Sequence, residues 1–293
     1  MSAEITVTQL RSMLPPRPET GHKGVFGHVL ILAGSRGFTG AAKLACEGAM
    51  RSGVGLVTVG VPRPLGDLMA ASLVEAMSFV LPATEAETLA QDALEPALEF
   101  AGSKQAVVLG PGISQHPETR RFTLAFVKRC PVPMVIDADG LNNLSTDLGA
   151  VAPSPAPRVL TPHPGEMARL TGHSATEIQK DRENAARDLA ARLGCVMVLK
   201  GHRTVIADPS GEVFVNPTGN AGLAKGGAGD VLSGLIGGLV AQGMTGMHAA
   251  LLGVYLHGLA GDLAAAVKTQ RGMVASDVVS SIPAAWRAIE KDR

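Results

Sequence analysis

The stretch "NAGLAKGGAGDVLSGLIGGLVAQG", residues 220–243, gathers glycines directly before an apolar pattern and places one acidic residue, Asp230, where the two meet. From about Ala228 the apolar residues recur at helical spacing, and Gly243 is suited to end the helix. The first turn of a helix offers unpaired N–H groups and a partial positive charge. A glycine-rich loop that leads into such a turn is typical of an anion site, most often for phosphate.

Asp230 does not suit an anion site by charge alone, because a carboxylate repels phosphate. Its position is suited to a base that takes the proton of a hydroxyl while that hydroxyl attacks a phosphoryl group. The alternative is structural: Asp230 stabilises the helix dipole and the glycines only permit close packing. We expect that packing role for Gly234, Gly237 and Gly238, and the anion-binding role for residues 226–229.

The remainder of the chain predicts an α/β fold with a mostly parallel central sheet and helices on both faces. A hairpin is predicted over 204–216, and the proline-rich stretch 152–157 is interpreted as a surface loop and not as a domain linker. We therefore expect a single domain over 1–293, with 1–20 as a leader. Near-continuous apolar runs predict buried strands at 28–34, 55–61, 105–110, 133–137, 158–162 and 196–201, and helical patterns cover 39–53, 87–101 and 174–194.

Composition argues against several classes of function. Lys+Arg and Asp+Glu both number 26 and aromatics make up 3%, so neither charge nor stacking surfaces favour nucleic acid as a partner. Cys46, Cys130 and Cys195 are widely spaced, which suits a reducing cytoplasm and predicts neither a disulfide framework nor a zinc site. The apolar windows 229–243 and 247–267 are interpreted as buried helices and not as membrane spans.

Other phosphate motifs are missing or misplaced. No G-K-[ST] tripeptide occurs, and "GVG" at 53–55 precedes a strand instead of following one. Small residues do follow two strands, at 34–41 and 110–113, where open α/β sheets place ligands; each can equally be a tight turn. Asp137 and Asp139 end another strand, where they can hold Mg²⁺ through water or cap the next helix; we predict no direct metal ligand.

Two further segments carry candidate binding residues. "TPHPGE" holds His163 between two prolines, so its imidazole is rigidly placed, either for a ligand or for structure. "LKGHRT" places Lys200 where it can meet nucleotide phosphates or remain solvated.

The G-A-G-D element at 227–230 resembles the anion hole and base of the ribokinase-like superfamily. Together the motifs resemble the ADP- or ATP-dependent (S)-NAD(P)H-hydrate dehydratases over about residues 20–285, and the short leader predicts the stand-alone form without an epimerase domain. The motifs are "LAGSRGFTGAAKLACEGAMRSGVGLVTV" (32–59), "GPGIS" (110–114), "TPHPGEMARLTG" (161–172), "LKGHRTVI" (199–206) and "NPTGNAGLAKGGAGDVLSGLIGGLVAQG" (216–243).

The resemblance implies a ribokinase-like fold and a repair lyase that returns hydrated NADH or NADPH to NAD(P)H with ADP, or ATP, as co-substrate. Asp230 would activate the ring hydroxyl, and Mg²⁺ would help the amides of 226–229 to stabilise the transferred phosphoryl group. It also implies small-molecule partners only, no membrane, and a homo-oligomer such as a tetramer. The implied substrate-binding residues are Gly40, Ala41, Gly112, His163 and Asp230, and the implied nucleotide-binding residues are Lys200, Gly201, His202, Arg203, Thr204, Gly226, Gly227, Ala228 and Gly229.

Two rival functions are consistent with parts of the sequence. A kinase of the same fold would phosphorylate a vitamin precursor or sugar alcohol, and G-A-G-D alone does not exclude it. A nucleotide-binding regulator without catalysis would need no base, so Asp230 speaks against it.

Overall fold

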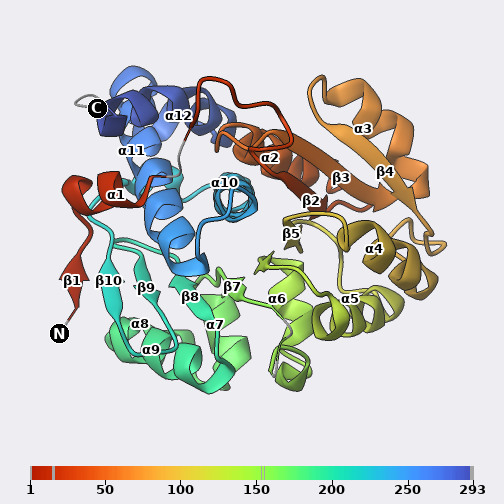
Figure 1. The fold of residues 1–293 in the computed structure, drawn as a ribbon. Helices are drawn as coiled ribbons and strands as arrows, with labels where there is room; N and C mark the ends of the chain where they lie inside the picture. The colour runs from red at the N-terminus through yellow and green to blue at the C-terminus, as the bar shows by residue number, and fades with distance from the viewer. Residues whose placement is uncertain (1, 15–16, 153, 155, 291–293) are drawn as a thin grey trace.

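A computed structural model describes residues 2–14, 17–152, 154 and 156–290. Its centre is one ten-stranded sheet in the order β1-β10-β9-β8-β7-β6-β5-β2-β3-β4 (Figure 1). The pairs from β8 through β4 are parallel, β9 runs antiparallel to both neighbours, and β1 lies parallel to β10. The strands are β1 Ala3–Glu4, β2 His28–Leu32, β3 Leu56–Pro62, β4 Met77–Leu81, β5 Ala106–Leu109, β6 Met134–Ile136, β7 Arg158–Leu160, β8 Val196–Leu199, β9 Val205–Ala207 and β10 Val213–Val215.

Helices cover both faces of this sheet, as Figure 1 shows. One apolar layer lies beneath α1, α2, α10, α11 and α12, and the other lies beneath α4 to α9. The helices are α1 Val7–Met13, α2 Thr39–Met50, α3 Gly66–Ser72, α4 Leu94–Ala101, α5 Pro117–Arg129, α6 Asp139–Leu144, α7 Pro164–Thr171, α8 Ala175–Lys180, α9 Arg182–Leu193, α10 Ala228–Ala241, α11 Gly246–Gly272 and α12 Ala275–Glu290.

The predicted parallel strands and the hairpin are confirmed, and the near-continuous apolar runs are explained by burial on both faces. Strands β1 and β4 are additional, because their exposed side chains give no continuous apolar run. The segment expected as a leader contributes β1 and α1, and Leu10 of α1 is completely buried.

Two predicted helices differ from the structure. The helix expected over 87–101 begins only at Gln91, as a 3-10 turn, because 83–89 form a turn closed by a bridge between Ala83 and Leu89. The pattern over 174–194 is two helices, broken at Asp181, whose side chain accepts the N–H of Asn184 and starts α9. Of the stretch 152–157, Pro153 and Pro155 lie outside the described residues.

Helix α10 reaches the centre of the molecule because its glycines let it approach α2 and the sheet closely. An added Cβ would lie 1.9 Å from Ala45 O at Gly234, 2.1 Å from Val108 Cγ2 at Gly237 and 2.1 Å from Ser52 Oγ at Gly238. The packing role predicted for these three glycines is therefore confirmed.

Helix α11 is long and apolar enough to cross a membrane by length and composition, with 61% of its most apolar window buried inside the structure. That burial is typical of the core helix of a globular protein, as the apolar pattern over 247–267 predicts.

Candidate functional site

The loops that carry the predicted site residues lie at one edge of the sheet. Parallel strands bring their carboxyl ends to the same edge, where open α/β sheets bind ligands. The loops after β2, β5, β6, β7 and β8 all begin there, and α10 starts beside them.

The glycine-rich loop before α10 is anchored at both ends by charged side chains. At its start, Asp262 of α11 accepts hydrogen bonds from Gly219 N (2.9 Å) and Asn220 Nδ2 (2.9 Å). At its end, Lys225 Nζ donates to Arg271 O (2.6 Å) and Met273 O (2.5 Å). The loop is thus fixed to the interior of α11 at Asp262 and to the C-terminal end of that helix at Arg271 and Met273, which leaves the amides near Gly226 in a defined place.

Gly227 is the N-cap residue of α10. Its φ of +91° favours glycine, and an added Cβ would lie 2.5 Å from Leu44 Cδ1. Gly226 differs, because no atom lies within 4 Å of where its Cβ would be. Of this pair, Gly226 is therefore free for a ligand and Gly227 is needed for the turn.

Asp230 lies half-buried in the first turn of α10. Burial, followed by the charge of Asp137, raises its pKa to about 7, against the opposing charge of Lys200. None of the described residues donates a hydrogen bond to the carboxylate; only its main-chain oxygen is bonded, by Ser233 Oγ. Its pKa near neutrality and its available oxygens are the properties of a general base.

Lys200, at the end of β8, joins the acidic residues around Asp230. Its ammonium donates to Asp137 Oδ1 at 2.5 Å and lies 3.8 Å from Glu166 Oε2. Burial alone would lower the pKa of Lys200, but the charges of Asp137 and Glu166 outweigh it and the pKa is raised. Its charge is already shared among protein carboxylates, so Lys200 is not a free point charge for phosphate.

His163 starts α7 through a capping box. Its Nδ1 accepts the N–H groups of Gly165 (2.9 Å) and Glu166 (3.3 Å), while Glu166 Oε2 accepts the N–H of His163 at 2.7 Å. Burial, and then the charge of Lys200, lowers the pKa of His163, so it is neutral at pH 7. Since Nδ1 is an acceptor, the remaining hydrogen lies on Nε2, which is 3.5 Å from Glu166 Oε1 on a half-exposed ring.

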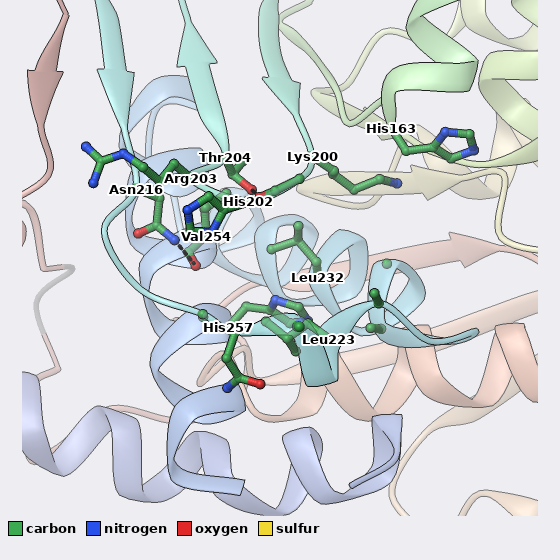
Figure 2. Close-up of a pocket in the computed structure, with 18 of the residues that line it drawn as sticks. His163, Lys200, His202, Arg203, Thr204, Asn216, Leu223, Leu232, Val254 and His257 are labelled. Atoms are coloured by element: carbon green, nitrogen blue, oxygen red, sulfur yellow. Dashed lines mark hydrogen bonds between the residues drawn. The ribbon is translucent and has the colours of Figure 1, made fainter. Parts of the chain in front are cut away.

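A cavity of about 770 Å³ opens between the ends of β8 to β10 and the helices α10 and α11 (Figure 2). His257 of α11 lies on its wall, where burial lowers its pKa to about 4. The cavity brings together most of the residues expected to bind nucleotide, with His163 at its rim. Its lining includes His163, Lys200, Gly201, His202, Arg203, Thr204, Asn216, Gly226, Ala228, Gly229, Leu232, Val254 and His257.

A second group of predicted residues lies apart from this cavity lining. At Gly112 an added Cβ would lie 3.1 Å from Ala41 Cβ, so the loop after β5 touches the start of α2. Ser35 Oγ also donates to Gly112 O at 2.8 Å, whereas the Cβ position of Gly40 is open. Gly40 is exposed, Ala41 is partly exposed and Gly112 is buried against Ala41, so the three residues lie together, with Gly40 and Ala41 at the surface.

Asp139 interacts both with the loop that contains Gly112 and, through its charge, with Asp230. Its carboxylate accepts the N–H of Ser114 at 3.0 Å, close to Gly112, and its charge also raises the pKa of Asp230. Between Asp137 and Asp139, Ala138 has φ +49°, a strained conformation for alanine and one often found at functional sites.

Sequence reasoning missed several residues that shape the site. Asp262 and Lys225 are not among the predicted site residues, although a charge within an apolar stretch, as at Asp262, is itself a signal of a specific partner. Asn216 Nδ2 donates to Thr218 O at 3.0 Å and fixes the strand-to-loop junction. Nothing local in the sequence marks Arg182 or His257 as neighbours of the cavity.

Comparison with known proteins gives consistent results. The profile of the NAD(P)H-hydrate dehydratase family matches residues 29–284. The chain belongs to this family. The ADP-dependent (S)-NAD(P)H-hydrate dehydratase of Bacillus subtilis is 36% identical to this chain. The match covers 97% of this chain and 98% of the Bacillus subtilis protein. The bifunctional NAD(P)H-hydrate repair enzyme Nnr of Moorella thermoacetica is 46% identical over 98% of this chain and 54% of its own length.

This chain thus spans about half the length of the bifunctional members of the NAD(P)H-hydrate dehydratase family that it matches. Solved structures agree with the fold. The Bacillus subtilis ADP/ATP-dependent NAD(P)H-hydrate dehydratase, co-crystallized with ATP/Mg²⁺, has a TM-score of 0.83 at 35% identity, covering 99% of both chains. A ribokinase-like superfamily protein from Enterococcus faecalis has a TM-score of 0.82 at 25% identity, covering 98% of this chain and 96% of its own. The predicted ribokinase-like fold is confirmed.

Proposed function

We propose that this protein dehydrates the S-form of hydrated NADH or NADPH at the expense of ADP, which gives NAD(P)H, AMP and phosphate. The observation that carries the proposal is Asp230, an available carboxylate with a pKa of about 7 at the start of α10. It stands in a chain whose family and relatives are hydrate dehydratases. Such an enzyme is a metabolite-repair lyase.

In the proposed reaction, Asp230 takes the proton of the ring hydroxyl as the oxygen attacks the terminal phosphoryl group of the nucleotide. The N–H groups around Gly226 and Gly229 stabilise the charge on the phosphoryl oxygens. Phosphate then leaves with the former hydroxyl oxygen, the adjacent ring carbon loses a proton, and the ring double bond returns. Phosphate is a far better leaving group than hydroxide, which is why nucleotide cleavage drives the dehydration.

The two groups of predicted site residues suit the two ligands. We assign the nucleotide to the cavity beside 200–204 and 226–229, and the hydrated dinucleotide to the region of Gly40, Ala41 and Gly112, with Asp230 between them. His163 would present its Nε2 hydrogen to an acceptor on the substrate.

Mg²⁺ would come with the nucleotide phosphates. Within the described part of the chain, no group of three or more His, Cys, Asp and Glu side chains is placed to hold a metal ion. When bound, the ion would neutralise phosphate charge.

The proposal concerns small-molecule ligands and a cytoplasmic enzyme. The three cysteines are free and buried, which suits a reducing compartment. The homo-oligomer implied by the family resemblance stays a prediction.

The test is incubation of the protein with hydrated NADH and ADP while the absorbance of reduced nicotinamide is followed. Return of that band with release of AMP supports the proposal, whereas a stable phosphorylated product would indicate a kinase. The Asp230→Asn variant should lose turnover and still bind ADP, because the amide has the same shape but accepts no proton. An active Asn variant would show that Asp230 is not the base.

A further inference from the structure

The nucleotide segment Lys200–Thr204 has an unusual backbone. Gly201 has φ +146° and Arg203 has φ +54°, a left-handed value that few side chains adopt. The only side chain of the segment that helps to close the turn is Thr204, whose Oγ1 donates to Gly201 O at 3.0 Å. We expect a segment with this backbone to adopt several conformations unless another part of the protein holds it in one of them.

Arg182 supplies that support from outside the segment. Its guanidinium donates through Nη1 to the carbonyl of His202 and, at 3.5 Å, to that of Arg203. Through Nη2 it donates to Leu199 O at 2.8 Å. One planar cation thus holds carbonyl groups before and after Gly201 and fixes the path of the turn between them.

The surroundings of Arg182 are built for this contact. It is the first residue of α9, and it comes there because the helical pattern breaks at Asp181. Gly201 leaves the space that the guanidinium occupies, since an added Cβ would lie 2.9 Å from Arg182 Nη2. Burial lowers the pKa of Arg182, but the guanidinium of an arginine keeps its charge in proteins, so Arg182 bonds the carbonyl groups as a cation.

We propose that Arg182 is a positioning residue that holds the Lys200–Thr204 turn in its nucleotide-binding shape before the nucleotide arrives. The proposal rests on the proposed function only in that a nucleotide binds at this turn. Arg182 bonds the carbonyl groups of the turn, so the N–H groups of 202–204, which line the cavity, stay available to a ligand. Fixing a loop beforehand removes the entropic cost of ordering it on binding, and the gain appears as affinity.

The experiment compares ADP binding by wild type and Arg182→Ala with isothermal titration calorimetry. Arg192→Ala is the matched control, because Arg192 lies on the same helix and also donates to a carbonyl, Leu170 O, at 3.3 Å. We expect Arg182→Ala to weaken ADP binding on the order of tenfold or more, and Arg192→Ala to leave it unchanged. In the repair assay, the KM for ADP should rise while kcat at saturating ADP stays near the wild-type value.

Two measurements separate positioning from general damage to the fold. Millimolar guanidinium should restore ADP affinity to Arg182→Ala and have no effect on wild type. In the absence of nucleotide, amide hydrogen exchange at 201–204 should be faster in Arg182→Ala than in wild type, with the strands β8 and β9 equally protected in both. If the alanine variant does not fold, Arg182→Lys takes its place, since lysine reaches one carbonyl but cannot form the fork.

Equal ADP affinity and equal exchange at 201–204 in wild type and the Arg182 variant would overturn the inference. A wild type that does not bind ADP would instead refute the proposed function, and the exchange measurement would still test Arg182. The two failures are therefore distinguishable.

Discussion

Replacement of Glu166 by Gln tests the electrostatics of the site directly. Glu166 is 5% exposed, and its carboxylate accepts the N–H of His163 at 2.7 Å. Glutamine has the same shape, offers the same kind of acceptor and is compatible with a capping box. The substitution therefore removes the charge and leaves the start of α7 in place.

The magnitude follows from the pKa of Glu166. Burial, only partly offset by Lys200, raises it from the ordinary 4.5 to about 7. A carboxyl whose pKa is raised in the folded state binds more protons than the unfolded chain between these two values, so stability falls as pH rises through that window. A difference of about 2.5 pKa units corresponds to about 3 kcal/mol, fully present below about pH 4.5 and lost above about pH 7.

Urea unfolding at about pH 5 and at about pH 8 measures this pH-dependent contribution of Glu166 to the free energy of unfolding. The stability of the Glu166→Gln variant relative to wild type should be greater at about pH 8 than at about pH 5 by about 2.5 kcal/mol, because part of the contribution is already lost at about pH 5. The pH dependence of groups that do not face Glu166 is common to both proteins and cancels in the difference. Asp230 does not cancel, because the charge of Glu166 helps to raise its pKa, and the loss of that charge changes the difference in the same direction. A difference between the two proteins that stays the same at both pH values would refute the assignment of a raised pKa to Glu166.

Two further predictions concern the rate and the packing. Because the pKa of Asp230 is about 7 and the base must be ionised, kcat/KM should fall about tenfold for each pH unit below about 7 and level off above it; a profile that is flat between about pH 5 and 7 would contradict this. Gly234→Ala should cost roughly 2–3 kcal/mol in urea unfolding, because the new methyl group would lie 1.9 Å from Ala45 O in α2. Gly226→Ala is its control, since its Cβ position is open, and a Gly234→Ala protein as stable as that control would show that α10 can move away from α2.

Much of the fold is visible in the sequence because its elements are decided locally. The strands β2, β5 and β8 are short apolar runs that must be buried on both faces, and α10 combines helical spacing with a glycine start. Strand β4 escaped prediction for a physical reason. It lies at the edge of the sheet with Met77 and Val80 exposed, so no continuous burial shapes its pattern.

The site was only partly predictable, because its side chains are paired across the fold. Lys200 in a loop beside glycine suggests a phosphate contact, yet its partner is Asp137, 63 positions away in the sequence. That pairing depends on β6, β7 and β8 being neighbours in the sheet, an order that spacing along the chain does not encode. For the same reason, Arg182 reads as one more charge on an amphipathic helix until the turn it holds is seen.

At Gly229 the sequence and the structure each explain a different part of the role of one residue. From the sequence it is one of several glycines that free backbone amides for an anion. In the structure, its missing Cβ would lie 3.3 Å from Lys200 Nζ and 3.7 Å from Asp137 Oδ2. The absence of a side chain thus lets the ion pair approach the first turn of α10, where its charges act on Asp230. The glycine immediately before Asp230 therefore has an electrostatic consequence as well as a steric one, since a Cβ here would be in tight contact with Lys200 Nζ, the cation that opposes the rise in the Asp230 pKa.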